Sequence, residues 1–241
     1  MKTKDWFTDW FNTPYYHILY KERNDDEAQL FMKKMTSFLN LPKTAHILDL
    51  PCGKGRHAVF LNSLGYKVTG SDLAENSILA AKAFENNTLN FSVHDMRQPL
   101  NNKYDAVFNL FTSFGYFEDD KEDIGILENM KRGLNKDGFF VFDFLNAKKV
   151  KLNLVAIETK TVDRITFNIK REIKNGFIFK HISFSVDGKN HAYTERVKYL
   201  DLDKMTSFFE KVGFTITNVF GNYHLNTYED KTSDRLIIIA K

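Results

Sequence analysis

The sequence predicts an α/β fold in which helices cover both faces of a mostly parallel sheet. From residue 45 onward, short apolar runs alternate with segments of helical periodicity, which is typical of strands joined by crossover helices. The predicted strands lie at 45–50, 66–71, 89–94, 104–109, 138–145, 214–223 and 235–241. The predicted helices between them lie at 57–64, 74–84, 121–134 and 201–212. We therefore expect a doubly wound, seven-stranded sheet.

The chain before this pattern is predicted to be helical. Asp25–Leu39 spaces its apolar side chains along one helix face, and Pro42 ends that helix. We therefore expect residues 1–42 to form an N-terminal helical cap on a core of 43–147 and 199–241.

The α/β rhythm is interrupted after the fifth predicted strand. Residues 161–200 are rich in Ile, Phe, Val and Thr, and Asn175-Gly176 and Asp187-Gly188 are strong signals for two-residue hairpin turns. About three antiparallel strands are expected within an insertion at 148–198. This insertion would cover a substrate or form a dimer contact, so the protein is expected to be a monomer or a homodimer.

Composition narrows the class of protein. The 241 residues carry 34 Lys and Arg against 31 Asp and Glu, a net charge of +3, and the basic residues form no stripe. This distribution argues against a nucleic-acid partner. Cys52 is the single cysteine, so an internal disulfide is excluded. The first residues do not resemble a secretory signal, and no apolar run reaches membrane-spanning length, so we expect a cytoplasmic protein without a membrane segment.

A ligand-binding turn is predicted at Asp49-Leu50-Pro51-Cys52-Gly53-Lys54-Gly55, between the first strand and the next helix. Glycines let a ligand approach the backbone, and the helix N-terminus offers unpaired N–H groups. Asp72, at the end of the second strand, could accept hydrogen bonds from a ribose diol. Gly53, Gly55 and Ala58 also fit the dinucleotide fingerprint G-x-G-x-x-G/A, so a NAD-dependent oxidoreductase is one alternative.

Two observations favour S-adenosylmethionine as the ligand. Asp49 lies four residues before the first glycine, where a pyrophosphate would be repelled but the amino group of a methionine moiety would be attracted, directly or through water. Asp95 follows the third strand and could accept the adenine amine while Met96 packs on the ring. Asp72 as a helix N-cap, and Asp95 as an ordinary loop carboxylate, remain the simpler interpretations.

The sequence resembles the class I S-adenosylmethionine-dependent methyltransferases, which have a Rossmann-like fold. ILDLPCGKGRHAVFLNSLGYKVTGSDLAENSILAAK resembles motifs I and II of that family, VHDMR its adenine-binding acidic loop, and YDAVFNLFTSFGYF its fourth motif. FEKVGF and RLIIIAK match its last helix and its final antiparallel strand pair. The resemblance covers roughly residues 45–145 and 200–241, and the motifs together are specific.

The resemblance implies a set of contacts to the cofactor, whose product form is S-adenosylhomocysteine. It assigns the methionine end, the ribose, the adenine and the sulfonium to successive motifs along the sheet edge. The predicted cofactor-binding residues are Asp49, Pro51, Gly53, Gly55, Arg56, Asp72, Leu73, Asp95, Met96, Asn109, Leu110 and Phe111. Lys54 departs from the small residue that is common in the family. Cys52 lies inside the cofactor turn, so we do not expect a catalytic cysteine.

The fourth motif narrows the methyl acceptor. Asn109-Leu110-Phe111-Thr112 lacks the prolines with which amino-methylating DNA enzymes hold a flipped base. We therefore expect transfer to an N, O or C atom of a small molecule, with an RNA or protein methyltransferase, or a non-catalytic relative, as alternatives. No general base is assigned, and no metal site is expected.

Candidate acceptor contacts come from the N-terminal aromatic residues, the fourth motif and the insertion. The N-terminal tyrosines are expected either to form a lid over the site or to pack helices on the sheet. The predicted acceptor-binding residues are Tyr15, Tyr16, Tyr20, Phe114, Tyr116, His181 and Tyr193. His191 and Glu195 are further candidates in the insertion, and Arg56 with His57 could bind a carboxylate.

Overall fold

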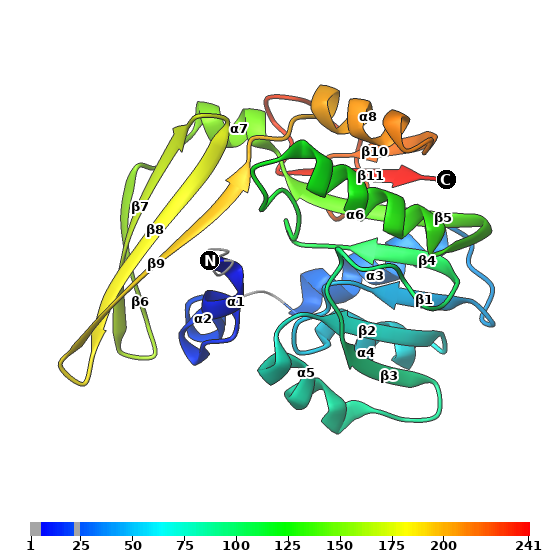
Figure 1. The fold of residues 1–241 in the computed structure, drawn as a ribbon, viewed down its shortest axis with the longest axis horizontal. Coiled ribbons are helices and arrows are strands. Elements are labelled where there is room, and N and C mark those ends of the chain that lie inside the picture. The colour runs from blue at the N-terminus through cyan, green and yellow to red at the C-terminus, as the bar shows by residue number, and fades with distance from the viewer. Residues whose placement is uncertain (1–5, 22–24) are drawn as a thin grey trace.

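A seven-stranded sheet forms the centre of the computed structural model, which describes residues 6–21 and 25–241 (Figure 1). Its strands are β1 (His46–Asp49), β2 (Lys67–Asp72), β3 (Leu89–Val93), β4 (Tyr104–Asn109), β5 (Leu134–Leu145), β10 (Ile216–Phe220) and β11 (Arg235–Ala240). Their order is β10-β11-β5-β4-β1-β2-β3. β1 to β5 run parallel, whereas β11 is antiparallel to both β5 and β10. The predicted doubly wound fold is confirmed.

Helices cover both faces of this sheet. They are α3 (Asp25–Phe38), α4 (Arg56–Ser63), α5 (Glu75–Ala81) with the short helix η1 (Lys82–Phe84), α6 (Asp120–Arg132) and α8 (Leu202–Lys211). Strand side chains alternate between two cores: Ile47 packs with α3, α4 and α5, while its neighbour Leu48 packs with α6 and α8. The two hydrophobic cores hold the sheet rigid, so that loops at its edge can carry a site.

The chain begins with two short helices, α1 (Trp6–Phe11) and α2 (Pro14–Leu19). Within the predicted cap at 1–42, residues 1–5 and 22–24 lie outside the described residues. α3 packs on the core sheet. α1 and α2 instead lie between the core and the insertion (Figure 1), where Trp10 and Leu19 are buried against Phe167 and Ile182. The first two helices and the insertion therefore share one hydrophobic core.

The insertion after the fifth strand is confirmed, but the expectation of three strands was wrong. After α7 (Ala147–Leu152), an antiparallel sheet contains β6 (Ile157–Val162), β7 (Ile165–Lys174), β8 (Phe177–Val186) and β9 (Lys189–Lys198). Sequence reasoning missed β6 because its turn into β7 contains no glycine. Asp163 and Arg164 form that turn with φ of 46° and 68°. These are the positive values that a two-residue hairpin requires and that glycine usually supplies.

A buried ion pair attaches the insertion to the core. Lys198, at the end of β9, places its Nζ 2.6 Å from Asp123 and 2.7 Å from Asp120, both on α6. The N–H of Lys198 also donates to the carbonyl of Gly115. These contacts fix the base of the insertion beside the loop that follows β4.

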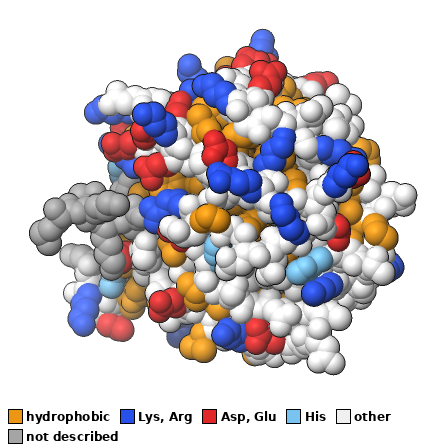
Figure 2. All heavy atoms as spheres, turned by 45° about the vertical axis from the view of Figure 1, so that its right-hand side comes forward, with side chains coloured by type: hydrophobic (Ala, Val, Ile, Leu, Met, Phe, Trp, Pro, Cys, Tyr) orange, Lys and Arg blue, Asp and Glu red, His pale blue; other side chains and the backbone are white. Residues whose placement is uncertain are grey.

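Charged side chains of both signs are mixed on one face of the molecule. On the face shown in Figure 2, basic side chains are scattered among acidic and uncharged ones and form no continuous stripe. Within residues 6–21 and 25–241, no helix is both long and apolar enough to cross a membrane.

Candidate cofactor and acceptor site

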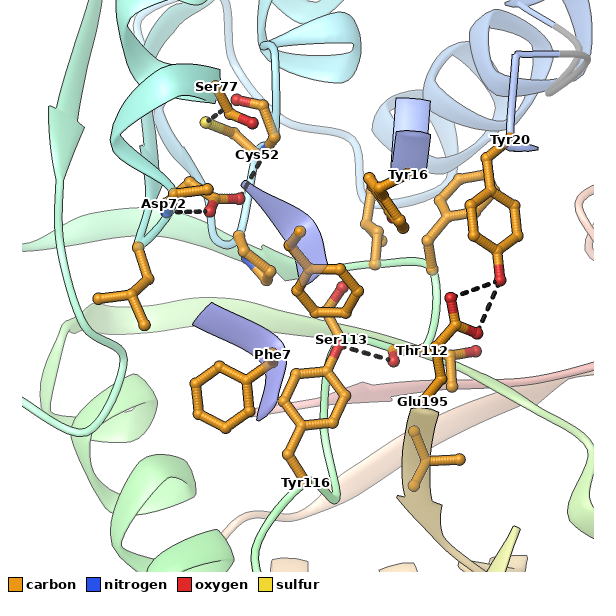
Figure 3. Close-up of a pocket in the computed structure, with 18 of the residues that line it drawn as sticks. Phe7, Tyr16, Tyr20, Cys52, Asp72, Ser77, Thr112, Ser113, Tyr116 and Glu195 are labelled. Carbon is orange, nitrogen blue, oxygen red and sulfur yellow. Dashed lines mark hydrogen bonds between the residues drawn. The ribbon is translucent and has the colours of Figure 1, made fainter. Parts of the chain in front are cut away.

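A cavity of about 730 Å³ opens at the carboxyl ends of β1, β2 and β4. This is the edge where parallel α/β sheets bind their ligands. Three parts of the chain line the cavity: the core loops, helices α1 and α2, and strands β7 to β9 of the insertion. Figure 3 shows Asp72 and Ser77 on one side of this space and Tyr20 and Glu195 on the other. The cavity has the size of a site for one or two small ligands.

The turn between β1 and α4 borders the cavity with Pro51, Cys52 and Gly53. Gly53 and Gly55 have φ of 55° and 84°, the left-handed region that favours glycine. A Cβ on Gly55 would lie 2.7 Å from the ring of Phe91, so the close packing of the turn on Phe91 requires glycine here. Gly55 does not line the cavity. Burial raises the pKa of the Cys52 thiol, which therefore remains protonated and gives no sign of a nucleophile.

Asp72 ties this turn to the end of β2. One carboxylate oxygen accepts the N–H of Gly53 at 2.8 Å, and the other accepts the N–H of Ala74 at 2.8 Å (Figure 3). The N-cap position of α5 is Ala74, so Asp72 is not the N-cap of that helix. Burial raises the pKa of Asp72 more than these N–H groups lower it. Asp72 lines the cavity, and its carboxylate can accept about four hydrogen bonds, more than these N–H groups supply.

Asp49 is fully buried beneath the turn and does not line the cavity. Among the described residues, no group completes a hydrogen bond with either of its carboxyl oxygens. Burial, together with the nearby charge of Asp72, raises the pKa of Asp49 to about 8, against the smaller opposing effects of the Ala58 N–H and Arg56. Asp49 is thus a buried acid whose opposing charge, Arg56, does not offset the effect of burial.

Asp95 and Met96 line the cavity after β3, as does Leu73 after β2. The guanidinium of Arg97 binds Asp95, with Nη2 2.7 Å and Nε 2.9 Å from Oδ2. Burial alone would raise the pKa of Asp95, but the hydrogen bonds from Arg97 outweigh it and the pKa is lowered. Asp95 is therefore held as a carboxylate, an acceptor of hydrogen bonds.

The loop after β4 supplies Leu110 and Phe111 to the cavity wall, but not Asn109. Asn109 is buried, and its amide donates to the carbonyl of Leu50 at 2.9 Å. This hydrogen bond joins β4 to the turn. The ring of Phe111 stacks on His57 with centroids 5.1 Å apart. The guanidinium of Arg56, which also lines the cavity, lies 5.0 Å from the same ring.

The opposite wall joins α2 to the insertion. Tyr16, Tyr20 and Tyr116, three of the predicted acceptor contacts, line it. The Tyr20 hydroxyl donates to Glu195 at 2.7 Å (Figure 3), and the indole N–H of Trp10 donates to the same carboxylate at 2.7 Å. Lys180 donates to the Tyr20 hydroxyl at 2.6 Å. Glu195 is thereby fixed at the edge of the cavity by two uncharged donors, and the ammonium of Lys180 lies 3.9 Å from its Oε2.

Four predicted acceptor contacts do not line the cavity. Tyr15 packs on Phe184, and Tyr193 is covered by the ring of Trp10, 4.5 Å away. Phe114 is buried against Phe142. His181 follows Lys180 on β8 and faces the other side of the sheet, where it contacts Glu172 and Thr194. The structure therefore shows which tyrosines and strand residues reach the cavity.

Several lining residues were not selected from the sequence. They include Phe7, Phe11, His94, Arg171, Lys180 and Arg235. The aromatic cluster near the N-terminus was a usable signal for the first two. Arg235, on the last strand, had no such signal, because it reaches the cavity only through the order of strands in the sheet. Among residues 6–21 and 25–241, no cluster of His, Cys, Asp and Glu could hold a metal ion.

Comparisons with known proteins show that the chain is similar to methyltransferases. Residues 47–138 match a family model for a methyltransferase domain. A putative methyltransferase of Geobacillus sp. (strain WCH70) is 24% identical over 241 residues, covering 94% of this chain and 96% of that protein. The family model and these relatives are all methyltransferases, so the comparisons favour an S-adenosylmethionine-dependent methyltransferase over the oxidoreductase alternative.

Solved structures share the fold. An S-adenosylmethionine-dependent methyltransferase from Clostridium acetobutylicum ATCC 824 gives a TM-score of 0.80 at 18% identity, covering 94% of this chain and 95% of that one. The structure of CalS10, an amino pentose methyltransferase from Micromonospora echinaspora bound to S-adenosylmethionine, gives 0.71 at 17% identity, with 95% and 97% coverage. Both alignments extend across nearly the whole chain and so include the insertion as well as the core.

Proposed function

We propose that the cavity binds S-adenosylmethionine together with a small-molecule acceptor, and that the enzyme methylates an N, O or C atom of that acceptor. The observation that carries this proposal is the enclosure of one cavity by the cofactor turn on one side and by α2 and the insertion on the other. Such a covered space suits a small molecule better than an RNA or a protein surface. That CalS10 acts on an amino pentose supports the same size of acceptor.

The described residues fit the cofactor. Its sulfonium supplies an activated methyl group, and its amino group supplies a cation. The unpaired acid Asp49 supports a role near that amino group, with Gly53 and Gly55 shaping the turn. Asp72 would accept the ribose hydroxyls, since its carboxylate lines the cavity and can accept more hydrogen bonds than those from Gly53 and Ala74.

The adenine and sulfonium ends are assigned to the next two loops. Asp95 would accept the adenine amine and Met96 would pack on the ring. Leu110 and Phe111 would lie beside the sulfonium, where an aromatic face favours positive charge.

The protein's own contribution to the reaction would be alignment. Well-oriented reactants can recover about 7–11 kcal/mol of a barrier. The aromatic side chains of Phe7, Tyr16 and Tyr116, which line the cavity (Figure 3), provide an aromatic wall that would exclude water and orient the acceptor. In this proposal the insertion acts as a substrate cover, and Glu195 is the acidic side chain that the insertion's described residues contribute to the cavity.

A ligand panel tests this function. S-Adenosylmethionine and S-adenosylhomocysteine are expected to raise the unfolding temperature, because they bind only the folded state, whereas NADH is not. The second arm is transfer of a labelled methyl group to fractions of a cell extract. Label in the low-molecular-mass fraction supports a small-molecule acceptor. Label in RNA or protein, or no stabilisation by S-adenosylhomocysteine, would contradict the proposal.

Replacing Glu195 by glutamine is expected to weaken acceptor binding selectively. The amide oxygen of Gln can still accept the N–H of Trp10, so the wall is preserved while the charge is removed. We expect KM for the acceptor fraction to rise about tenfold, close to 1.4 kcal/mol, with little change in S-adenosylhomocysteine affinity. Glu172→Gln, on the same sheet but outside the cavity, is the matched control. Equal effects in the two variants would refute the role of Glu195.

A further inference from the structure

A buried polar network lies behind the loop that follows β4. Asp143 on β5 is fully buried, and its Oδ1 accepts the Nε–H of Arg235 at 2.7 Å. Its Oδ2 accepts the hydroxyl of Tyr223 at 3.1 Å and the backbone N–H of Phe111 at 2.9 Å. The carbonyl of Asp143 also accepts the N–H of Thr112 at 3.0 Å. One residue thus binds two successive amides of the loop.

The loop that these contacts hold has an unusual backbone. Phe111 and Thr112 have φ of 60° and 64°, so two successive residues with branched or bulky side chains occupy the left-handed region. Such a conformation persists only where the surroundings enforce it. The Thr112 hydroxyl accepts the Nη2–H of Arg235 at 3.1 Å and the N–H of Leu145 at 3.0 Å. Arg235 therefore binds both Asp143 and the loop.

The strained loop forms part of the cavity wall. Phe111, Thr112 and Ser113 all line the cavity, and Figure 3 shows Thr112 close to Glu195, with Asp72 on the other side of the view. The Thr112 carbonyl also accepts the hydroxyl of Tyr116 at 3.2 Å, which fixes one ring of the aromatic wall. A shift of this loop would therefore move the cavity wall at Phe111, Thr112 and Tyr116.

We infer that Asp143, Arg235 and Tyr223 are positioning residues that fix the Phe111–Thr112 loop and thereby set the alignment of the acceptor with the methyl donor. This inference rests on the proposed function for its catalytic consequence. The contacts that fix the backbone of the Phe111–Thr112 loop do not depend on the proposed function. Asp143 and Tyr223 are not among the lining residues, and they act through the loop.

The test uses the full-length chain with Tyr223→Phe and Arg235→Gln. We expect hydrogen exchange at the amides of Phe111 and Thr112 to become about tenfold faster, because the network that protects them is weakened. At saturating S-adenosylmethionine, kcat toward the acceptor fraction should fall at least about tenfold, since small misplacements of reactants cost large factors in rate. The Kd of S-adenosylhomocysteine should stay within about threefold, because Asp72 and Asp95 still hold it.

Tyr66→Phe is the matched control, because it also removes the hydroxyl of a buried tyrosine, one that bonds Leu41 outside the network. Exchange and kcat that match this control in both test variants would overturn the inference. So would a fall in kcat that Tyr66→Phe reproduces. If wild-type protein transfers no methyl group, the proposed function fails, and the exchange measurement still tests the network. Should Arg235→Gln not fold, Tyr223→Phe alone suffices, since it removes a single oxygen.

Discussion

Replacing Asp72 by alanine is expected to weaken S-adenosylmethionine binding at least about a hundredfold. The carboxylate faces the cavity and would accept the ribose hydroxyls, and hydrogen bonds to a charged group contribute about 1.5–3 kcal/mol each. The same substitution removes the acceptor for the N–H of Gly53, so the turn loses its anchor to β2. Both effects act in one direction, and isothermal titration with S-adenosylhomocysteine measures their sum.

Two further variants separate these effects. Asp72→Asn keeps one acceptor oxygen and is expected to bind with intermediate affinity. Asp105→Ala removes a carboxylate that also accepts a backbone N–H, that of His46 at 2.8 Å, but at the opposite end of the sheet. It should bind the cofactor like wild type. If Asp72→Ala retained wild-type affinity, the assignment of Asp72 to the ribose would be wrong.

The stability of the protein without cofactor is expected to fall as the pH rises from about 4 to about 8. Burial and the charge of Asp72 raise the pKa of Asp49 to about 8 in the folded state, whereas an aspartate in an unfolded chain has a pKa of about 3.9. Between these values the folded state binds the additional proton. The free energy of unfolding therefore decreases with pH, by up to about 1.4 kcal/mol per pH unit from this group.

Asp49→Asn provides the comparison, because its side chain cannot ionise. Urea denaturation at about pH 5, 6.5 and 8 should show the variant gaining stability relative to wild type as the pH rises. The same variant should bind S-adenosylhomocysteine more weakly, since it lacks the carboxylate proposed to attract the amino group. Parallel stability curves for variant and wild type would contradict the raised pKa. Stronger cofactor binding by the variant would contradict the role of Asp49.

The parts of the site that were predictable from sequence depend on contacts between neighbours along the chain. Gly53 and Gly55 belong to one strand–turn–helix unit. Asp72 ends β2 and Asp95 follows β3, and each of these strands pairs in parallel with the strand before it in the chain. The carboxyl ends of such strands meet at one sheet edge, so these positions followed from order alone. The pattern of apolar runs likewise determined the seven-stranded sheet.

The rest depends on contacts that sequence order does not reveal. Asn109 matched a motif, but its side chain is buried and its amide donates to the carbonyl of Leu50 in the turn after β1. β6 had no glycine at its turn, and its two positive φ values are visible only in the structure. Arg235 meets Asp143 because β11 pairs with β5 in an antiparallel register that sets Arg235 opposite Leu145. No local pattern in the sequence specifies that register.

The shared core of α1, α2 and the insertion affects how acceptor specificity can be exchanged between related enzymes. Trp10 packs with Phe167 in that core and also donates to Glu195 at the cavity edge, although these residues belong to segments far apart in the chain. A graft of the insertion alone would place a foreign sheet against α1 and leave the Trp10 N–H without its acceptor. If the insertion is the substrate cover proposed above, the N-terminal helices and the insertion must therefore be transplanted together to change the acceptor.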